Sequence, residues 1–459
     1  MERFSGSDAM FWHLEDEVTP MHTLKVVVLD TSRRGLPVTL DCLTDSLTPY
    51  LGLVPRSTQK VVTAKGFRGR PYWVTDENFD LTQHLDEVTL PAPGDRIALD
   101  DLLGTLAMRP LERDRPLWRM TLVHGLANGE QAVVVQVHHA ICDGVAALNM
   151  FLAATTDAPG AAPDRMEPEF VPPVDVDTLR LHARAEVRDH IRGVRRLARL
   201  AQATRKTSAE FRRTGDLPPR IGARRTVFNA RSGAARVCAS AAIDLADLKT
   251  IARATESTIN GVLHSVIAGA VREEFRARGE SLDQPAIAIF GVCHDTARER
   301  RWGNAIATAS VYLRVDIADP IERLRATARS CARSVERRRA VGFELPKAMA
   351  HYTARVAPRA RSLFGPRTPV VVNHLTTANV AGPDHMRWFG DVAVTDWISV
   401  AVAVAPADVN LTAYSYNGKL SVGLVSTPES LPNPAGLLAR LQPAVEEILT
   451  ALDREPACA

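Results

Sequence analysis

The chain has 459 residues, of which 46% are hydrophobic and 24% charged, a composition typical of globular proteins. This length exceeds what one hydrophobic core usually serves, so we expect two domains. The net charge of +3 comes from 56 basic and 53 acidic residues, which argues against a protein that binds nucleic acid through bulk positive charge.

The six cysteines lie at irregular spacings without a CxxC pair, which indicates reduced thiols rather than a disulfide framework or a zinc site. The N-terminal segment has early acidic residues and no continuous apolar stretch, so we expect no signal peptide. Uncharged apolar runs stay below the roughly 18 residues of a membrane-spanning helix. These features predict a cytoplasmic protein and leave attachment to a membrane surface open.

The first third of the chain predicts a mixture of strands and helices. Residues 21–29 read as a strand, and leucines at helical spacing follow over 40–47. A helix is expected to begin near Asp100 and to end before Pro116. Two β-type runs then flank Asn128-Gly129, a strong hairpin signal, and an apolar helix follows over 145–155.

A segment rich in proline, alanine and acidic residues begins at 156 and predicts a linker. It leads into a basic amphipathic helix expected over 178–214, with an apolar stripe of Val187, Ile191, Val194, Leu197 and Ala201. Two interpretations stay open: a solvated helix that packs one stripe on the body, or an interfacial helix attracted to anionic lipid. The flanking cations are Arg184, Arg188, Arg192, Arg195, Arg196 and Arg199.

From about residue 224 the chain again mixes strands and helices, including a long helix capped at Thr258 and a second hairpin at Asn417-Gly418. Neither half shows regular βαβ alternation, so we predict the α+β class. The expected organisation is an N-terminal domain over 1–155, a linker with the basic helix over 156–223, and a C-terminal domain over 224–459.

The stretch VQVHHAICDG, residues 135–144, ends a valine-rich strand in two histidines. Successive strand residues point to opposite faces, so His138 and His139 are expected to serve different roles, one structural and one displayed in a cavity. The same geometry weakens a metal-site reading, because ligands must converge on one point. Asp143 is expected to fix the local turn, and Gly144 to allow a tight bend or a close backbone approach.

A neutral imidazole displayed in a cavity is a natural general base near pH 7. No GxSxG nucleophile motif is present, and Cys142 lies in the loop without evident oxyanion donors. Direct transfer assisted by histidine is therefore preferred to a covalent intermediate. The alternative on the bare motif is a pair of core histidines with satisfied hydrogen bonds.

The HHxxxDG pattern of residues 138–144 resembles the superfamily of CoA-dependent acyltransferases. Four further stretches resemble its bacterial wax ester synthase/diacylglycerol acyltransferase family in particular, and they occur in the family's order. They are SGSDAMFWHLEDEVTPMHTL near the start, RDRPLWRMTLVHGL before the histidines, and ANVAGP with LTAYSYNGKLSVGLV near the end.

The resemblance implies two domains of chloramphenicol acetyltransferase type, with a crossover and an interdomain tunnel. It implies acyl-CoA as co-substrate, diacylglycerol or a fatty alcohol as acceptor, and no metal or other cofactor. His139 would act as general base with His138 in support, next to Gly144. Asp143 would be architectural, and Arg56 is the expected partner of its carboxylate.

Further candidate site residues follow from the same resemblance. Asn260 is expected to line the site, and Trp118 to form a wall of the acyl pocket or to pack in the core. Asn379, with Gly382 and Pro383, is expected to set a turn near the tunnel. The chain departs from the family at Gly261, where an aspartate is usual, and at Ala381, where a proline is common.

Several functions remain to be distinguished. The first is acyl transfer from a long-chain acyl-CoA to diacylglycerol or a fatty alcohol. Others are transfer to a different hydroxyl or amine, as in condensation domains, or a lipid-binding homologue without turnover. A metal-dependent hydrolase is disfavoured by the strand geometry. Because lipid substrates lie in membranes or droplets, the helix over 178–214 is the candidate surface contact.

Overall fold

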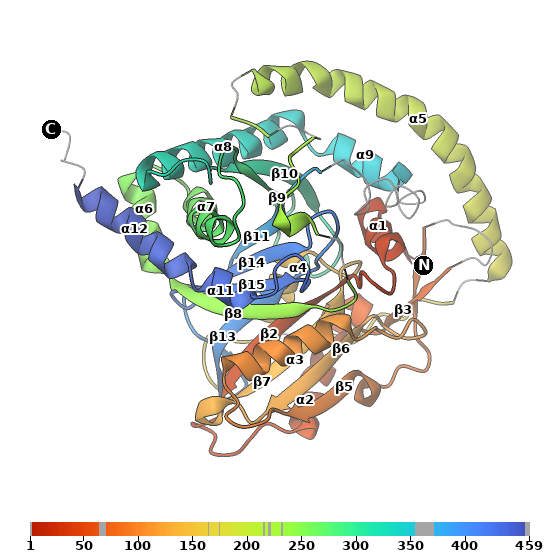
Figure 1. The fold of residues 1–459 in the computed structure, drawn as a ribbon. Helices are drawn as coiled ribbons and strands as arrows, with labels where there is room; N and C mark the ends of the chain where they lie inside the picture. Colours follow the sequence, from red (N-terminus) through yellow and green to blue (C-terminus); the bar gives the residue numbers. More distant parts are fainter. Residues whose placement is uncertain are drawn as a thin grey trace.

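Two six-stranded sheets form the framework of the protein (Figure 1). The computed structural model describes residues 2–63, 70–163, 165–173, 175–213, 216–218, 222–230, 233–353 and 371–454.

The first sheet is mainly antiparallel and is buried on both faces. Its face with Val26 and Val134 packs against helix α3 (Arg96–Met108), and its face with Val27 and Val133 lies toward helices α2 (Leu40–Leu47) and α4 (Gly144–Ala154). The alternation of valines along one strand therefore supplies two cores. The strand order is β12 (Arg387–Phe389), β13 (Val392–Val400), β2 (His22–Asp30), β7 (Gln131–His138), β6 (Trp118–His124) and β5 (Leu85–Thr89).

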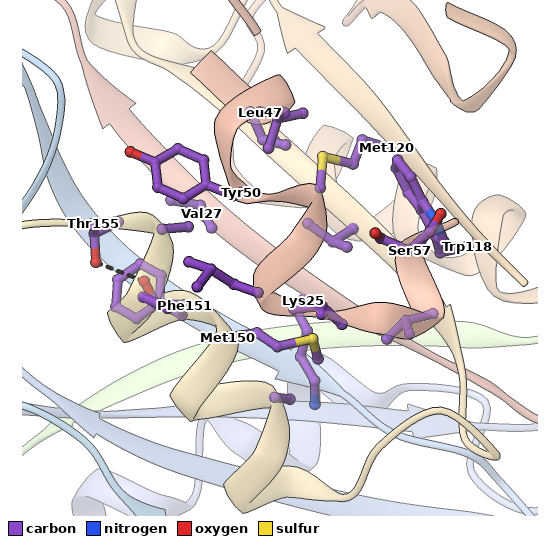
Figure 2. A pocket seen from close by; sticks show the side chains of 18 of the residues that line it. Lys25, Val27, Leu47, Tyr50, Ser57, Trp118, Met120, Met150, Phe151 and Thr155 are labelled. Carbon is purple, nitrogen blue, oxygen red and sulfur yellow. Dashed lines mark hydrogen bonds between the residues drawn. The ribbon is translucent and has the colours of Figure 1, made fainter. Parts of the chain in front are cut away.

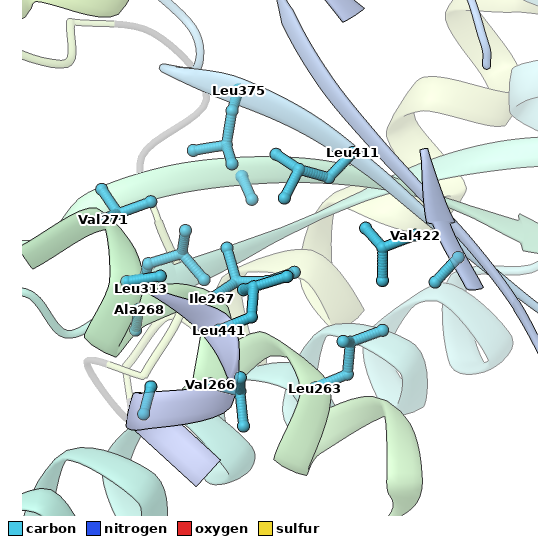
Figure 3. Packing of buried hydrophobic residues seen from close by; sticks show 14 of the residues in the cluster. Leu263, Val266, Ile267, Ala268, Val271, Leu313, Leu375, Leu411, Val422 and Leu441 are labelled. Carbon is cyan, nitrogen blue, oxygen red and sulfur yellow. The ribbon is translucent and has the colours of Figure 1, made fainter. Parts of the chain in front are cut away.

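The second sheet is covered by helices α7 (Ile259–Ala277), α8 (Pro320–Val341) and α12 (Leu441–Arg454). Figure 3 shows apolar side chains of α7 facing leucines and valines of the sheet. The remaining helices are α6 (Leu245–Ala254), α9 (Glu344–Thr353) and α11 (Pro434–Leu438). The strand order is β10 (Ile306–Leu313), β9 (Ala286–Cys293), β11 (Leu375–Ala381), β14 (Val409–Tyr416), β15 (Lys419–Ser426) and β8 (Val237–Asp244).

A crossover joins the two halves of the chain. Strands β12 and β13, from the second half, continue the first sheet by antiparallel pairing of β13 with β2. The expected α+β class and crossover are confirmed, whereas the boundaries at 155 and 224 stay predictions. Both expected hairpins form, between β6 and β7 and between β14 and β15.

The N-terminal segment forms a small sheet and a helix beside the first sheet. Strand β1 (Glu2–Arg3) pairs with β4 (Tyr72–Thr75), and β4 pairs with β3 (Gln59–Val62). Helix α1 (Gly6–Leu14) starts with a capping box in which Ser5 and Asp8 bond each other's backbone. Short 3₁₀ turns η1 (Thr48–Leu53) and η2 (Pro55–Ser57) follow α2.

Helix α3 begins earlier than the sequence suggests. Its N-cap is Asp95, which accepts a hydrogen bond from the Ala98 amide, so the prediction of a start near Asp100 was wrong. Asp100 lies inside the helix. Its carboxylate accepts hydrogen bonds from the amide of Ser240 on β8, at 3.0 Å, and from the Ser240 hydroxyl. This carboxylate therefore links two elements rather than capping one.

The basic helix is α5 (Val176–Arg212), a 37-residue arm that curves along the outside of the molecule past α9 and α8 (Figure 1). The expected apolar stripe does not define its inner face, because Val194 is 65% exposed. Glu186, Gly193 and Ser208 are buried instead. The side chains of Val187 and Ile191, and all of Thr214, lie outside the described residues.

The described helices include none that combines the length and the apolar character needed to cross a membrane.

Candidate active site

The histidine motif lies where β7 ends and α4 begins. The His139 amide donates to the carbonyl of Met21 at 2.6 Å, and the Ile141 amide donates to His138 at 2.9 Å, which turns the chain. Asp143 is the N-cap of α4 and accepts hydrogen bonds from the amides of Val145 and Ala146, both at 3.0 Å.

The carboxylate of Asp143 also binds a loop from the second half of the chain. It accepts hydrogen bonds from Nη2 of Arg300 at 2.9 Å and from the amide of Ala305 at 2.8 Å. The Gly303 amide donates to Ile141 at 2.6 Å, so the two loops are joined by backbone as well. The carboxylate of Asp143 therefore bonds both the start of α4 and the opposing loop, and the residue is buried to 2% exposure.

The expected partner of Asp143, Arg56, was wrong. Arg56 lies on η2, where its guanidinium pairs with Glu2 at 2.5 Å, bonds Gln59 and covers the ring of Trp73 at 4.8 Å. Its donors are directed to β1 and β3. The arginine that pairs with the Asp143 carboxylate is therefore Arg300 and not Arg56.

Two residues contact the imidazole of His139, and a third, Asp8, holds one of them. The ring of Phe11 lies parallel to it, with 3.9 Å between centroids and 8° between planes. Nδ1 lies 3.2 Å from Oδ1 of Asn304, whose Nδ2 donates to Asp8 at 2.8 Å and to the His139 carbonyl at 2.7 Å. Asp8 and Phe11 are three residues apart on α1, so they share the face that meets the motif.

These contacts determine which ring nitrogen of His139 carries the proton. Since Nδ2 of Asn304 donates to the carboxylate of Asp8 and to the carbonyl of His139, Oδ1 of Asn304 is the atom that faces Nδ1. Nδ1 therefore carries the proton in the neutral ring, and Nε2 has the free lone pair. Burial lowers the pKa of His139 to about 4, and the positive charge of Lys25 lowers it further although a backbone hydrogen bond opposes the shift. The imidazole is thus neutral near pH 7.

His138 points to the other face and is buried to 1% exposure. Its Nδ1 accepts a hydrogen bond from the Ala140 amide at 3.0 Å, and its Nε2 lies 3.5 Å from the carboxylate of Glu15. Although burial raises the pKa of Glu15, the hydrogen bond and charge of His138 hold it at about 2. The opposite directions of the two histidines follow from the strand alternation.

An apolar cavity of about 200 Å³ lies between the first sheet, η1 and α4 (Figure 2). Val137 and Ile141, two residues before and after His139, both line it. Trp118 lines it as well, stacks on His84 and donates from Nε1 to Ser57 at 2.8 Å, so it serves both packing and the wall. The polar side chains of the lining are Lys25, Tyr50, Arg56, Ser57 and Thr155.

Asn260 and Asn379 are absent from the residues that line this cavity. Asn260 lies on α7, donates to Cys331 at 3.4 Å and accepts from His264 through its carbonyl. The prediction that Asn379 lies in a turn was wrong. This residue lies within β11 opposite Ala413, and the strand continues to Ala381.

Two glycines of the motif regions have steric explanations. A Cβ on Gly144 would lie 2.8 Å from the hydroxyl of Tyr414, which donates to the Gly144 carbonyl, so the close backbone approach is the role that applies. The amide of Gly261 donates to the N-cap hydroxyl of Thr258, and the residue lies beside Ala328 on α8. A side chain at position 261 would first meet Ala328 and Thr258, which are not among the residues that contact His139.

Sequence reasoning missed Asp8, Phe11, Arg300 and Asn304. Asp8 and Phe11 lie inside SGSDAMFWHLE, the stretch that carried the family resemblance, so that stretch held a signal. Arg300 and Asn304 lie in RERRWGNA, where one sequence offers no periodicity or motif to single them out. Within the described ranges, no three His, Cys, Asp or Glu side chains are grouped so that they could hold a metal ion.

The two sheets, the crossover and the histidine motif at a domain junction define the class of CoA-dependent acyltransferases with the chloramphenicol acetyltransferase fold. The chain belongs to the wax ester synthase/diacylglycerol acyltransferase family: residues 4–263 match the family's catalytic domain and residues 302–449 its C-terminal domain. The protein is accordingly an acyltransferase enzyme, and the expected family and fold are confirmed.

Relatives and solved structures agree with this assignment. A Mycobacterium tuberculosis H37Rv protein provisionally named a diacylglycerol O-acyltransferase is 31% identical, with 96% of this chain and 95% of that protein covered. Another from the same strain is 30% identical, covering 98% of each. The wax ester synthase/diacylglycerol acyltransferase of Marinobacter aquaeolei VT8 superposes with a TM-score of 0.71 at 20% identity, covering 99% and 100%.

Condensation domains share the fold at a greater distance. The first condensation domain of the calcium-dependent antibiotic synthetase has a TM-score of 0.58 at 15% identity, with 100% of this chain and 97% of that one covered. The starter condensation domain of rhizomide synthetase, solved in complex with C8-CoA, has a TM-score of 0.57 at 12% identity, covering 98% and 95%.

Proposed function

We propose that the protein transfers a long-chain acyl group from acyl-CoA directly to the hydroxyl of diacylglycerol or a fatty alcohol, with His139 as general base. The observation that carries the proposal is the environment of His139: a neutral imidazole with Nδ1 bonded to Asn304, two residues from Val137 and from Ile141, which both line an apolar cavity. A positioned base of this kind accelerates transfer by about 10²–10⁴.

The reaction needs one proton to move twice. Nε2 of His139 takes the proton of the acceptor hydroxyl while the oxygen attacks the thioester carbonyl and forms a tetrahedral intermediate. The C–S bond then breaks, and the departing CoA thiolate takes the proton back from Nε2. Asn304 keeps the Nδ1–H bond throughout, which stabilises the imidazolium formed between the two steps.

A covalent intermediate on Cys142 is disfavoured. Burial raises the pKa of the Cys142 thiol to about 12, so the reactive thiolate is scarce near neutral pH. Cys142 is 3% exposed and belongs to the core beside α4. Direct transfer requires no nucleophile from the protein.

The apolar cavity fits the chain of a fatty acyl group, since pockets for such ligands are lined by aliphatic and aromatic side chains. Trp118 and Phe151 provide aromatic walls, and Met120 and Met150 provide flexible ones (Figure 2). The names of the mycobacterial relatives favour diacylglycerol as the acceptor. The family name also covers wax ester synthases, whose acceptor is a long-chain alcohol. Another hydroxyl or amine acceptor, or lipid binding without turnover, are the competing outcomes.

The test is CoA release by purified protein from palmitoyl-CoA, with dioleoylglycerol or hexadecanol as acceptor. We expect acceptor-dependent release that falls at least 10²-fold in His139→Ala. His385→Ala is the matched control, because His385 is half exposed and pairs with Asp157 and Asp384 at the surface. Folded wild-type protein that binds palmitoyl-CoA but releases no CoA with either acceptor would contradict the proposal.

We further propose that α5 brings the enzyme to an anionic membrane or lipid-droplet surface. Among the side chains of this helix that the structure describes, the exposed cations outnumber the exposed acids Asp177, Asp189 and Glu210 by nine to three. Amphipathic basic helices bind such surfaces through electrostatic attraction and apolar contact. The exposed cations are Arg180, Arg184, Arg188, Arg192, Arg195, Arg196, Arg199, Arg205 and Lys206.

A further inference from the structure

A lysine lies in the wall of the apolar cavity. Lys25, on β2, is one of the residues that line this space and is 7% exposed, and its nitrogen lies at the edge of the cluster of lining side chains (Figure 2). Its Nζ donates to the hydroxyl of Ser399 at 2.6 Å and lies 5.2 Å from the centroid of the Tyr414 ring. Among the described residues, no carboxylate forms an ion pair with it. An ammonium has three N–H donors, so it can serve a further acceptor.

The other buried cation of the same wall differs in this respect. Arg56 pairs with the carboxylate of Glu2, bonds Gln59 and covers the ring of Trp73. Its charge is therefore compensated by the protein itself. The contrast leaves Lys25 as the lining cation whose charge no ion pair compensates within the described residues.

Packing alone does not account for Lys25. The residues beside it on the same face, Val27, Val135 and Val137, are apolar, and an aliphatic side chain would avoid the cost of burying an ammonium. Burial accordingly lowers the pKa of Lys25 to about 8. The ammonium form still predominates at pH 7.

We propose that Lys25 recognises a hydrogen-bond-accepting oxygen on the acyl chain, so that the cavity prefers an oxygenated acyl group to an unsubstituted one. This inference rests on the proposed function, in which the cavity holds the acyl chain. An unsubstituted chain excludes water from the ammonium and replaces none of its hydrogen bonds, whereas a hydroxyl or carboxylate oxygen on the chain restores one. The recognition is non-covalent.

Two oxygenated ligands distinguish where the oxygen lies along the chain. 3-Hydroxyhexadecanoyl-CoA carries it near the thioester, and hexadecanedioyl-CoA carries a carboxylate at the far end. Hexadecanoyl-CoA, of equal length, is the reference. Dissociation constants can be read from quenching of tryptophan fluorescence, because Trp118 and Trp397 both line the cavity. The His139→Ala background prevents turnover during the measurement.

With Lys25 present, at least one oxygenated ligand should bind about tenfold more tightly than hexadecanoyl-CoA. Lys25→Met, which keeps length without charge, should abolish this preference or reverse it. Val27→Met is the matched control, since it alters the same face of β2 and should change the affinity for all three ligands alike. If the ratios of the dissociation constants are the same with and without the Lys25→Met substitution, the proposal is overturned.

A pH series tests the same point without a substitution in the cavity wall. Binding of hexadecanoyl-CoA should tighten as pH rises from 7 to 9, because neutral Lys25 is less costly to enclose, and binding of the preferred oxygenated ligand should not. The titratable groups that face Lys25 are His139, Cys142, Asp143 and Tyr414. The pKa values of His139 and Cys142 are about 4 and about 12, that of Tyr414 is raised by burial, and Asp143 is paired with Arg300. Parallel pH dependences for all ligands would contradict the inference.

The two proposals fail in distinguishable ways. Loss of CoA release with an intact ligand preference would remove the proposed catalysis and leave the role of Lys25. Intact CoA release with no preference linked to Lys25 would remove this inference alone.

Discussion

Asp143 and Arg300, 157 residues apart in the chain, form an ion pair at 2.9 Å in which neither side chain exceeds 12% exposure. The pair joins the loop after β7 to the loop between β9 and β10, and so connects the two halves beside His139. Asp143 also caps α4 with the same carboxylate. One side chain thus fixes the start of a helix and the position of the opposing loop.

Arg300→Met should lower the free energy of unfolding by about 3 kcal/mol, because it leaves a buried carboxylate without its cation. The three amides that still bond Asp143 keep the loss at the low end of the range for broken buried pairs. Denaturant titration with Arg298→Met as control, an exposed arginine of the same loop, measures the effect. Equal midpoints for the two variants would show that the pair does not stabilise the junction.

Sequence reasoning found the elements whose signals are local. The valine-rich β7, both Asn-Gly hairpins and the opposite directions of His138 and His139 follow from period-2 patterning and turn chemistry. These signals are carried by neighbouring residues, so a single chain suffices to read them. The HHxxxDG motif is local as well, because it spans only residues 138–144, so the sequence alone reveals the family resemblance.

Contacts across the fold could not be predicted in this way. The family resemblance implied Arg56, in the first half of the chain, as the partner of Asp143, yet the two halves meet at the motif and the partner is Arg300 from the second half. Asn304 reaches His139 for the same reason. The start of α3 was misplaced because Asp95 and Asp100 are both good caps, and only the buried contact of Asp100 with Ser240 decides between them.

The lowered pKa of His139 predicts an unusual acid limit for activity. A base with a pKa of about 4 stays unprotonated until the pH approaches 4, so kcat/KM for CoA release should be flat from pH 7 to pH 5.5 and half-maximal near pH 4. Pre-incubation at each pH, followed by assay at pH 7, separates protonation from unfolding. An acid limb centred at pH 6.5 or above would show that burial does not lower this pKa.

Asn304→Asp should shift that limb toward higher pH. A carboxylate beside Nδ1 favours the imidazolium, so the pKa of His139 should rise, whereas Asn304→Ala should lower kcat roughly 10–100-fold without such a shift. Asn304 is a positioning residue, and the displacement of the pH profile is the readout that a merely structural residue would not give. Identical acid limbs in wild type and Asn304→Asp would contradict the contact between Asn304 and His139.

The outward face of α5 predicts binding to anionic vesicles. Glu186 and Gly193 are buried, the latter where the ring of Tyr352 on α9 approaches, whereas Arg192, Arg195 and Arg196 are exposed, Arg196 with Glu344 of α9 at 3.8 Å. Reversing these three arginines to glutamate should weaken partitioning by about 3 kcal/mol, near 1 kcal/mol for each cation removed.

Co-sedimentation with phosphatidylserine-containing vesicles at low and high salt measures this partitioning, because the attraction is screened by salt. The matched control reverses three exposed arginines on other helices, Arg253, Arg329 and Arg339, and so makes the same change in net charge. If the two triple variants sediment alike, the attraction belongs to the whole protein and not to α5. A specific loss in the α5 variant would instead place the acyltransfer site beside the surface that holds its lipid substrates.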